Sequence, residues 1–114
     1  MIVLDRRETP RGELVLRQVE DAFEIISNGT FLMDSRNGAS ERLLVSAPLR
    51  SVAAPRRVLI GGLGMGFSVR EALGDRRTES VTVVEIEPAV IEWQRGRLAR
   101  VSGAALQDPR VQVH

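Results

Sequence analysis

The 114-residue sequence contains no cysteine, and its only histidine is residue 114. The absence of cysteine excludes disulfides and thiolate metal sites, and with one histidine a transition-metal site is not expected. A chain without disulfides is compatible with a reducing compartment. We therefore expect a cytoplasmic protein without a bound metal.

The sequence also lacks long apolar runs and a marked excess of charge. No run of about 18 apolar residues is present, so we expect no membrane-spanning helix. The first residues, Met1 to Arg7, are too short and too acidic for a signal peptide. All sixteen cations are arginine and the net charge is +1. Such a chain has no global field that favours nucleic acid or an acidic membrane as a partner.

The first part of the chain is predicted to form a small antiparallel β-meander. Asn28-Gly29 is a strong hairpin signal, because type I′ turns need positive φ at both central positions. Strands are predicted at 22–26 and 30–33 around this turn, and a third at 13–18. The residues before Gly12 are interpreted as a polar leader.

A short helix and a proline-containing link follow the meander. Residues 40–47 have apolar side chains at helical spacing, with Ser40 as the candidate N-cap. Pro48 lies near the end of this helix, and Ala53-Ala-Pro55 breaks the pattern before the next strand. We place the domain boundary there, with an N-terminal part at 1–54 and a second domain at 55–114.

The second domain is predicted to alternate strands and helices. Residues 57–60 and 81–84 are continuous apolar runs, typical of strands that are covered on both faces. Helices are predicted at 66–73 and 89–101, and a third strand begins at 111–113. This βαβαβ order implies a parallel sheet with right-handed crossovers.

A glycine turn after the first of these strands is the candidate binding site. Gly62, Gly64 and Gly66 allow positive φ and close approach of the backbone to a ligand. Glu85 ends the second strand, where an acid is placed to accept hydrogen bonds from ribose hydroxyls. The predicted cofactor-binding residues are Gly61, Gly62, Leu63, Gly64, Met65, Gly66, Glu85 and Ile86.

The glycine spacing favours one class of nucleoside. A dinucleotide fingerprint would place its third glycine at position 67, but Phe67 stands there. The spacing at 62, 64 and 66 is that of adenosylmethionine sites. Together with the order of strands and helices, it predicts an α/β fold class: a meander followed by the first half of an adenosylmethionine-type Rossmann sheet. An NAD-type ligand and a structural turn without a ligand stay open. Trp93 is interpreted as a packing residue, with an adenine platform as the alternative.

Four ordered motifs resemble those of the polyamine aminopropyltransferases, that is, spermidine synthase and its relatives. They are Gly61-Gly-Leu-Gly-Met-Gly66, Phe67-Ser-Val-Arg-Glu-Ala-Leu73, Val83-Val-Glu-Ile-Glu-Pro88 and Asp108-Pro-Arg-Val111. The resemblance implies an aminopropyl- or methyltransferase that binds decarboxylated adenosylmethionine, adenosylmethionine or methylthioadenosine. It also implies that Glu85 holds the ribose hydroxyls.

The sequence departs from the family pattern at several positions. Gly64 stands where the family has an acid that helps to hold the amine end of the cofactor. Leu32 aligns near a ligand-binding glutamine, and Ser40 and Glu41 lie near the tyrosine and histidine of the amine-substrate side. Binding of the nucleoside rests on the glycines and Glu85, so these departures affect it less than recognition of a polyamine.

The resemblance also implies that the family's adenine-pairing acid and catalytic aspartate follow the third strand, after residue 114. We therefore assign no catalytic residue and expect this chain to be inactive by itself. The strand at 57–61 would then be an exposed apolar edge, which favours pairing with another chain. A homodimer through this edge is expected. The alternative function is a non-catalytic, self-associating domain without a small-molecule ligand.

Overall fold

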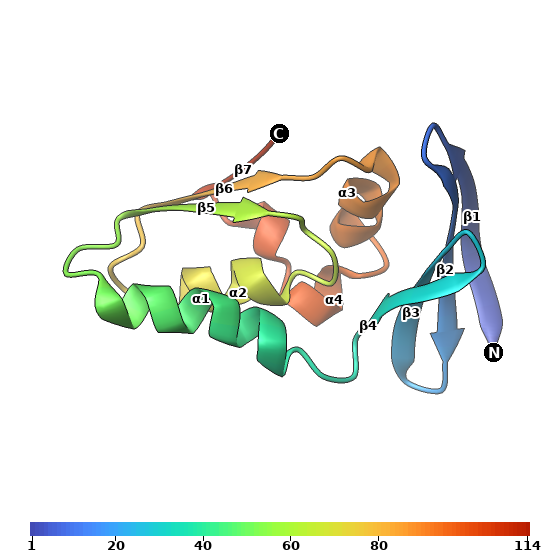
Figure 1. Ribbon diagram of the computed structural model, residues 1–114, viewed down its shortest axis with the longest axis horizontal. Coiled ribbons are helices and arrows are strands. Elements are labelled where there is room, and N and C mark those ends of the chain that lie inside the picture. Colours follow the sequence, from blue (N-terminus) through green and yellow to red (C-terminus); the bar gives the residue numbers. More distant parts are fainter. The chain divides into compact units, whose positions relative to one another are not determined.

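The computed structural model describes residues 1–114, which form two compact units, Met1–Asn37 and Gly38–His114 (Figure 1). The first unit is an antiparallel sheet and the second an α/β unit with a parallel sheet. This confirms the predicted fold class. None of the helices has the length and apolar character needed to cross a membrane.

The first unit is a four-stranded meander in the order β1-β2-β3-β4. Its strands are β1 (Ile2–Thr9), β2 (Gly12–Val19), β3 (Ala22–Ser27) and β4 (Thr30–Asp34). Strand β1 occupies the segment that the sequence analysis interpreted as a leader. It pairs with β2 from Ile2 opposite Gln18 to Thr9 opposite Gly12. The leader interpretation was wrong because charged side chains are tolerated on an edge strand, so polarity does not exclude a strand there.

The predicted Asn28-Gly29 turn joins β3 to β4, with φ of 50° and 76° at its two residues. The Asn28 side chain also links this turn to the start of β2, because its Oδ1 accepts a hydrogen bond from the Glu13 N–H at 2.8 Å. The central strands carry the buried apolar residues of the unit. Leu16 and Ile25 are cross-strand partners, and both have no exposed surface.

The second unit contains a three-stranded parallel sheet in the order β5-β6-β7. Its elements are α1 (Ala39–Ser51), β5 (Arg57–Gly61), α2 (Phe67–Gly74), β6 (Ser80–Val84), α3 (Pro88–Arg95), α4 (Ala99–Ser102), a 3₁₀ turn at Ala105–Gln107 and β7 (Val111–Val113). Helices α1 and α2 lie along one face of this sheet (Figure 1). The strand order is the one expected for the first half of a Rossmann sheet.

Helix α1 belongs to the second unit, whereas the sequence analysis placed residues 40–47 in the first. The unit boundary falls between Asn37 and Gly38 and not at 54/55, because α1 packs against α2. The helix also extends past Pro48 to Ser51, and its N-cap is Gly38 and not Ser40. The Pro-containing link at 53–55 is therefore a connection inside the second unit.

The single helix predicted at 89–101 is broken into α3 and α4. Gly96 ends α3 with φ of −122° and ψ of −101°, which are not helical values. Leu98 then turns inward and has no exposed surface. Glycine has the lowest helix propensity after proline, so the break falls where the local preference for helix is weakest.

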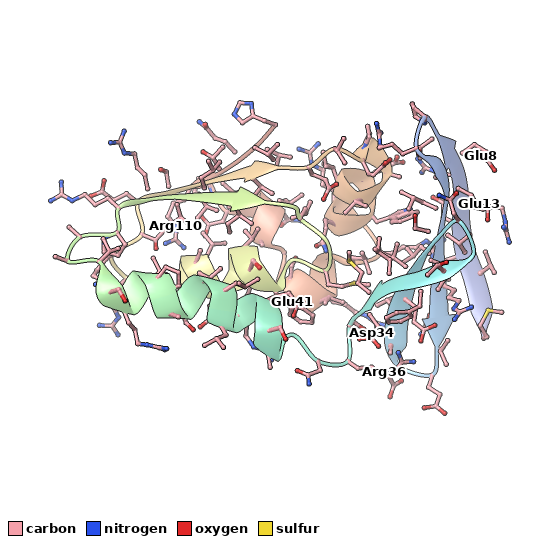
Figure 2. All side chains as sticks on the ribbon, viewed as in Figure 1. Glu8, Glu13, Asp34, Arg36, Glu41 and Arg110 are labelled. Carbon is pink, nitrogen blue, oxygen red and sulfur yellow. The ribbon has the colours of Figure 1, made fainter.

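The core of the second unit lies between the sheet and the helices on one of its faces. Val81 and Val83 of β6 and Val69 of α2 have no exposed surface. The opposite face of the sheet is more open, because Leu59 is 72% exposed and Val84 50%. Arg110, just before β7, links the segment between α2 and β6, because it donates to the Thr78 and Leu73 carbonyls at 3.3 and 3.2 Å (Figure 2).

Candidate functional site

The glycine turn leaves β5 and leads directly into α2. Its first N–H, that of Gly62, donates to the Val84 carbonyl at the end of β6 at 2.8 Å. Gly62, Gly64 and Gly66 have φ of 92°, 50° and 83°, which confirms that this turn uses the left-handed region. Gly66 is the N-cap of α2, and its N–H donates to the Leu63 carbonyl at 2.9 Å. The turn therefore lies at the carboxyl end of the parallel strands, where ligands bind in open α/β sheets.

Glu85 follows β6 and contacts the turn directly. Its Oε1 accepts a hydrogen bond from the Leu63 N–H at 2.8 Å, and its Oε2 accepts one from the Glu87 N–H at 3.0 Å. The side chain thus spans from the glycine turn to the start of α3. A carboxylate has about four lone-pair sites, so both oxygens keep the capacity to accept a further hydrogen bond.

Gln94 holds the same turn from the other side. Its Nε2 donates to the Gly64 carbonyl at 2.7 Å, although the two residues are 30 positions apart. The side chain comes from α3 and is buried, with 1% of the residue exposed. Sequence reasoning missed Gln94, because a polar residue inside a helix pattern gives no sign of the direction in which its side chain points.

The other predicted residues present backbone more than side chain at this site. The side chains of Leu63 and Met65 are buried, at 3% and 4% exposure, so they pack beneath the turn. Gly61 and Gly62 are exposed, and Ile86 is 66% exposed. The turn can therefore offer its backbone groups to a ligand, together with the carboxylate of Glu85.

Trp93 lies on α3 and is 3% exposed. A side chain this buried offers no open ring face for stacking with an adenine. Two of the pockets in this unit lie away from the turn. One is lined by Ser46, Leu49 and Glu71, and the other by Arg70, Leu73 and Gln107.

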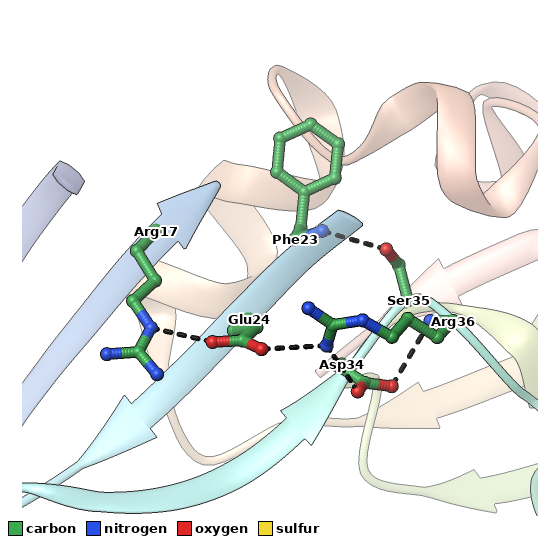
Figure 3. Close-up of polar contacts among 6 residues, drawn as sticks. All are labelled: Arg17, Phe23, Glu24, Asp34, Ser35 and Arg36. Atoms are coloured by element: carbon green, nitrogen blue, oxygen red, sulfur yellow. Dashed lines mark hydrogen bonds and ion pairs between the residues drawn. The ribbon is translucent and has the colours of Figure 1, made fainter. Parts of the chain in front are cut away.

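The first unit holds a separate cluster of charged side chains (Figure 3). Glu24 lies between two guanidinium groups, with Oε1 2.7 Å from Arg17 Nε and Oε2 2.7 Å from Arg36 Nη1. Arg36 also binds the Asp34 carboxylate at 2.7 Å. The hydrogen bonds from Arg36 and Arg17 hold the pKa of Glu24 below its ordinary value. All charges of this cluster are paired, which is typical of a structural network.

The β5–turn–α2–β6–acid arrangement places the second unit among Rossmann-type folds. Residues 38–114 match the family described as the spermine/spermidine synthase domain. The match covers more than half of the chain, and the chain belongs to this family.

Curated relatives agree with this assignment. The chain is 41% identical over 71 residues to a polyamine aminopropyltransferase of Thermoanaerobacter sp., a match that covers 62% of this chain and 25% of the relative. It is 32% identical over 108 residues to polyamine aminopropyltransferase 2 of Ralstonia nicotianae, covering 92% of this chain and 21% of the relative.

Two solved structures share the fold. A spermidine synthase in complex with the transition-state analogue AdoDATO superposes with a TM-score of 0.87 and 23% identity, over 99% of this chain and 39% of that chain. The spermidine synthase of Thermotoga maritima gives a TM-score of 0.85 at 22% identity, over 99% and 40%. The chain thus spans less than half the length of these relatives.

Proposed function

We propose that this chain supplies the nucleoside-binding part of a spermidine synthase-like transferase. The ligand is an adenosylmethionine-type nucleoside: decarboxylated adenosylmethionine, adenosylmethionine or methylthioadenosine. It lies over the glycine turn, and Glu85 accepts hydrogen bonds from its ribose hydroxyls. The transferred group is an aminopropyl or methyl group, and the transfer step requires residues other than those of this chain.

The position of Glu85 carries this proposal. Its carboxylate lies at the carboxyl end of β6 and is tied to the Leu63 N–H, 22 residues away, at 2.8 Å. The two backbone donors fix the orientation of the carboxylate before any ligand binds. A preorganised acceptor loses little entropy on binding, and hydrogen bonds to a charged group are among the stronger ones. The remaining lone pairs suit a diol, which presents two donors side by side.

Calorimetric titration of the chain with methylthioadenosine tests the proposal. The same titration is repeated with analogues of the ligand that lack one ribose hydroxyl. Removal of the 2′- or 3′-hydroxyl from the ligand should weaken binding to the wild-type chain by about tenfold or more, because a hydrogen bond to a carboxylate is lost. In Glu85→Ala the parent ligand should bind as weakly as the deoxy analogues, and removal of the hydroxyls should then have little further effect.

Glu85→Ala also frees the Leu63 N–H, so weaker binding alone could come from a loosened turn. The comparison of parent and deoxy ligands separates this effect from the loss of ribose recognition. Glu79→Ala is the matched control, since Glu79 is an exposed acid of the same unit with only a 3.9 Å contact to Arg56. Equal losses for the deoxy analogues in wild-type protein and in Glu85→Ala would contradict the proposed role of Glu85. No binding of any nucleoside at millimolar concentration would contradict the function itself.

Self-association is a second candidate function, favoured by the open edge of the parallel sheet. Strand β5 pairs with β6 on one side, and no strand of this chain pairs with its other side. Leu59 on this strand is 72% exposed, and a flat apolar edge is a template for another chain. We propose a homodimer in which two chains meet at β5, with or without a bound nucleoside.

Light scattering at a concentration on the order of tens of micromolar tests the dimer. Leu59→Arg should give a monomer, because it places a charge on the proposed interface. Leu44→Arg is the matched control, since Leu44 is 73% exposed on α1 and lies outside β5. A monomeric wild-type chain, or equal masses for the two variants, would contradict the proposal.

A further inference from the structure

Gln94 is the one buried polar side chain that reaches the glycine turn from α3. Its Nε2 donates to the Gly64 carbonyl at 2.7 Å, and the residue is 1% exposed. Its other polar atom, Oε1, is buried and has no hydrogen-bond partner. One half of this amide is therefore engaged with the turn and the other half is unsatisfied.

The unsatisfied half makes a purely structural role unfavourable. A buried acceptor without a partner loses its hydrogen bond to water and gains none in return. An apolar side chain of the same length would avoid that cost, but it would leave the Gly64 carbonyl without its donor. What the glutamine supplies at this position is therefore the contact of Nε2 with the Gly64 carbonyl.

That contact fixes the direction of one peptide unit. The peptide between Gly64 and Met65 is planar and trans, so its carbonyl and its N–H point in opposite directions. The carbonyl is directed to Gln94, and the Met65 N–H is therefore directed away from α3. This N–H has no acceptor within the chain. It is a free donor at the turn, next to the Leu63 N–H that Glu85 holds.

We propose that Gln94 is a positioning residue, which holds the Gly64–Met65 peptide so that the Met65 N–H donates to an acceptor atom of the bound nucleoside. This inference rests on the proposed nucleoside site. Glu85 and Gln94 then act on neighbouring peptides of one turn, the first by accepting from an N–H and the second by donating to a carbonyl.

Gln94→Met tests the inference, because methionine has the same length and no hydrogen-bond donor. We expect affinity for methylthioadenosine to fall about tenfold, while the midpoint of urea unfolding changes little, because the unpaired Oε1 is removed together with the bond to the Gly64 carbonyl. A residue that only supports the fold would show the opposite pattern, with lower stability. Gln107→Met is the matched control, since Gln107 is exposed and no hydrogen bond of its side chain is present.

Gln94→Glu adds a readout that depends on the donor alone. A protonated carboxyl donates to the Gly64 carbonyl, whereas a carboxylate repels it. The ratio of its affinity to that of the wild type should therefore rise towards one as the pH is lowered. The corresponding ratio for Gln94→Met should stay flat. Groups shared by all three proteins, Glu85 among them, cancel in these ratios.

Amide hydrogen exchange of the free chain separates this inference from the proposed function. In Gln94→Met the Leu63 and Gly66 N–H groups should exchange about tenfold faster or more, with β6 unchanged. If methylthioadenosine fails to bind the wild type, the proposed function fails. Unchanged exchange of the Leu63 and Gly66 N–H groups in Gln94→Met overturns the positioning role, whether or not the ligand binds. If the ligand binds and Gln94→Met retains wild-type affinity, the positioning role is overturned while the proposed function stands.

Discussion

The same short clip, an aspartate and an arginine two residues later, occurs in both units but reaches different targets. In the first unit, Arg36 bonds Asp34 and then the carboxylate of Glu24, each at 2.7 Å. In the second unit, Arg77 bonds Asp75 and then the Leu49 carbonyl in the last turn of α1, at 2.9 Å.

Another such pair in the second unit, Asp108 and Arg110, repeats the pattern of Asp75 and Arg77. Arg110 bonds Asp108 and reaches the Leu73 carbonyl in the last turn of α2, at 3.2 Å. The last carbonyls of a helix have no partner inside it, and a cation there also interacts favourably with the helix dipole. Arg77 and Arg110 therefore complete helix ends, whereas Arg36 completes a charge network across strands.

The difference shows how each unit uses its polar side chains. The antiparallel sheet already pairs most of its backbone groups between strands, so its charged side chains pair with one another, while polar side chains such as Asn28 bind backbone groups only at its turns and ends. The parallel unit leaves helix ends and a glycine turn with unpaired backbone groups. Its polar side chains, Glu85 and Gln94 included, bind these groups, and the proposed site is a product of the same pattern.

The largest effect that would sharpen this comparison is expected at Gly66. A Cβ added there would lie 2.4 Å from the Ser102 Cβ, and φ is +83°. Gly12 in the first unit has φ of +116°, but the Cβ built there meets the Asn28 side-chain amide, which can move away if it gives up its hydrogen bond to the Glu13 N–H. Gly66→Ala should destabilise the chain by about 3 kcal/mol, the sum of backbone strain and overpacking.

Gly12→Ala is the matched variant, and it should cost less, about 1–2 kcal/mol. Urea unfolding followed by circular dichroism measures both. If the two variants were equally stable, the close backbone approach beneath the glycine turn would have no special role in the second unit.

A smaller effect should separate the two kinds of clip by their response to salt. Arg36→Met removes a partner of two carboxylates, Glu24 and Asp34, whereas Arg110→Met removes a donor to two carbonyls and one carboxylate. Both variants should lower the melting temperature. At 1 M salt the screening length falls to about 3 Å, which weakens interactions between exposed charges more than hydrogen bonds to neutral carbonyls. The drop in melting temperature caused by Arg36→Met should therefore shrink more in high salt than the drop caused by Arg110→Met. Equal shrinkage would remove the distinction between the units.

Sequence reasoning recovered the features that local chemistry dictates. The Asn28-Gly29 turn was predictable because few residues adopt positive φ, and the strands at 57–60 and 81–84 because continuous apolar runs favour strands. The expectation that both faces of these strands are covered was wrong, because Leu59 is 72% exposed and Val84 50%. Strand β1 was missed because its polar residues are tolerated only through pairing with β2. The boundary before α1 depends on packing against α2, which no local pattern encodes. A single glycine at position 96 marks where the helix breaks, but a lone glycine inside a helical pattern does not by itself predict a break.

The candidate site divides in the same way. The glycines and Glu85 follow a fixed spacing after two strands, so their meeting at one edge of the sheet was predictable, and Leu63 accordingly donates to Glu85. The contact of Gln94 with the Gly64 carbonyl depends on how α3 packs beside the glycine turn. Contacts of this kind are decided by three-dimensional packing and leave no periodic signal in the chain.

The smallest effect is expected for the pH dependence of stability that Asp75 and Arg77 contribute at the end of α1. The hydrogen bond from Arg77 lowers the pKa of Asp75 from its ordinary value of 3.8 to about 2. Because the folded pKa is the lower one, the carboxylate stabilises the fold fully above its ordinary pKa, and this contribution is lost as the pH falls towards about 2. Asp75→Asn should lower stability at neutral pH by a small amount, because the group is exposed and solvent screens the ion pair. Urea titrations of both proteins between about pH 6 and pH 2 measure the difference, which should narrow as the pH falls. A constant gap would mean that Arg77 caps α1 without help from the charge of Asp75.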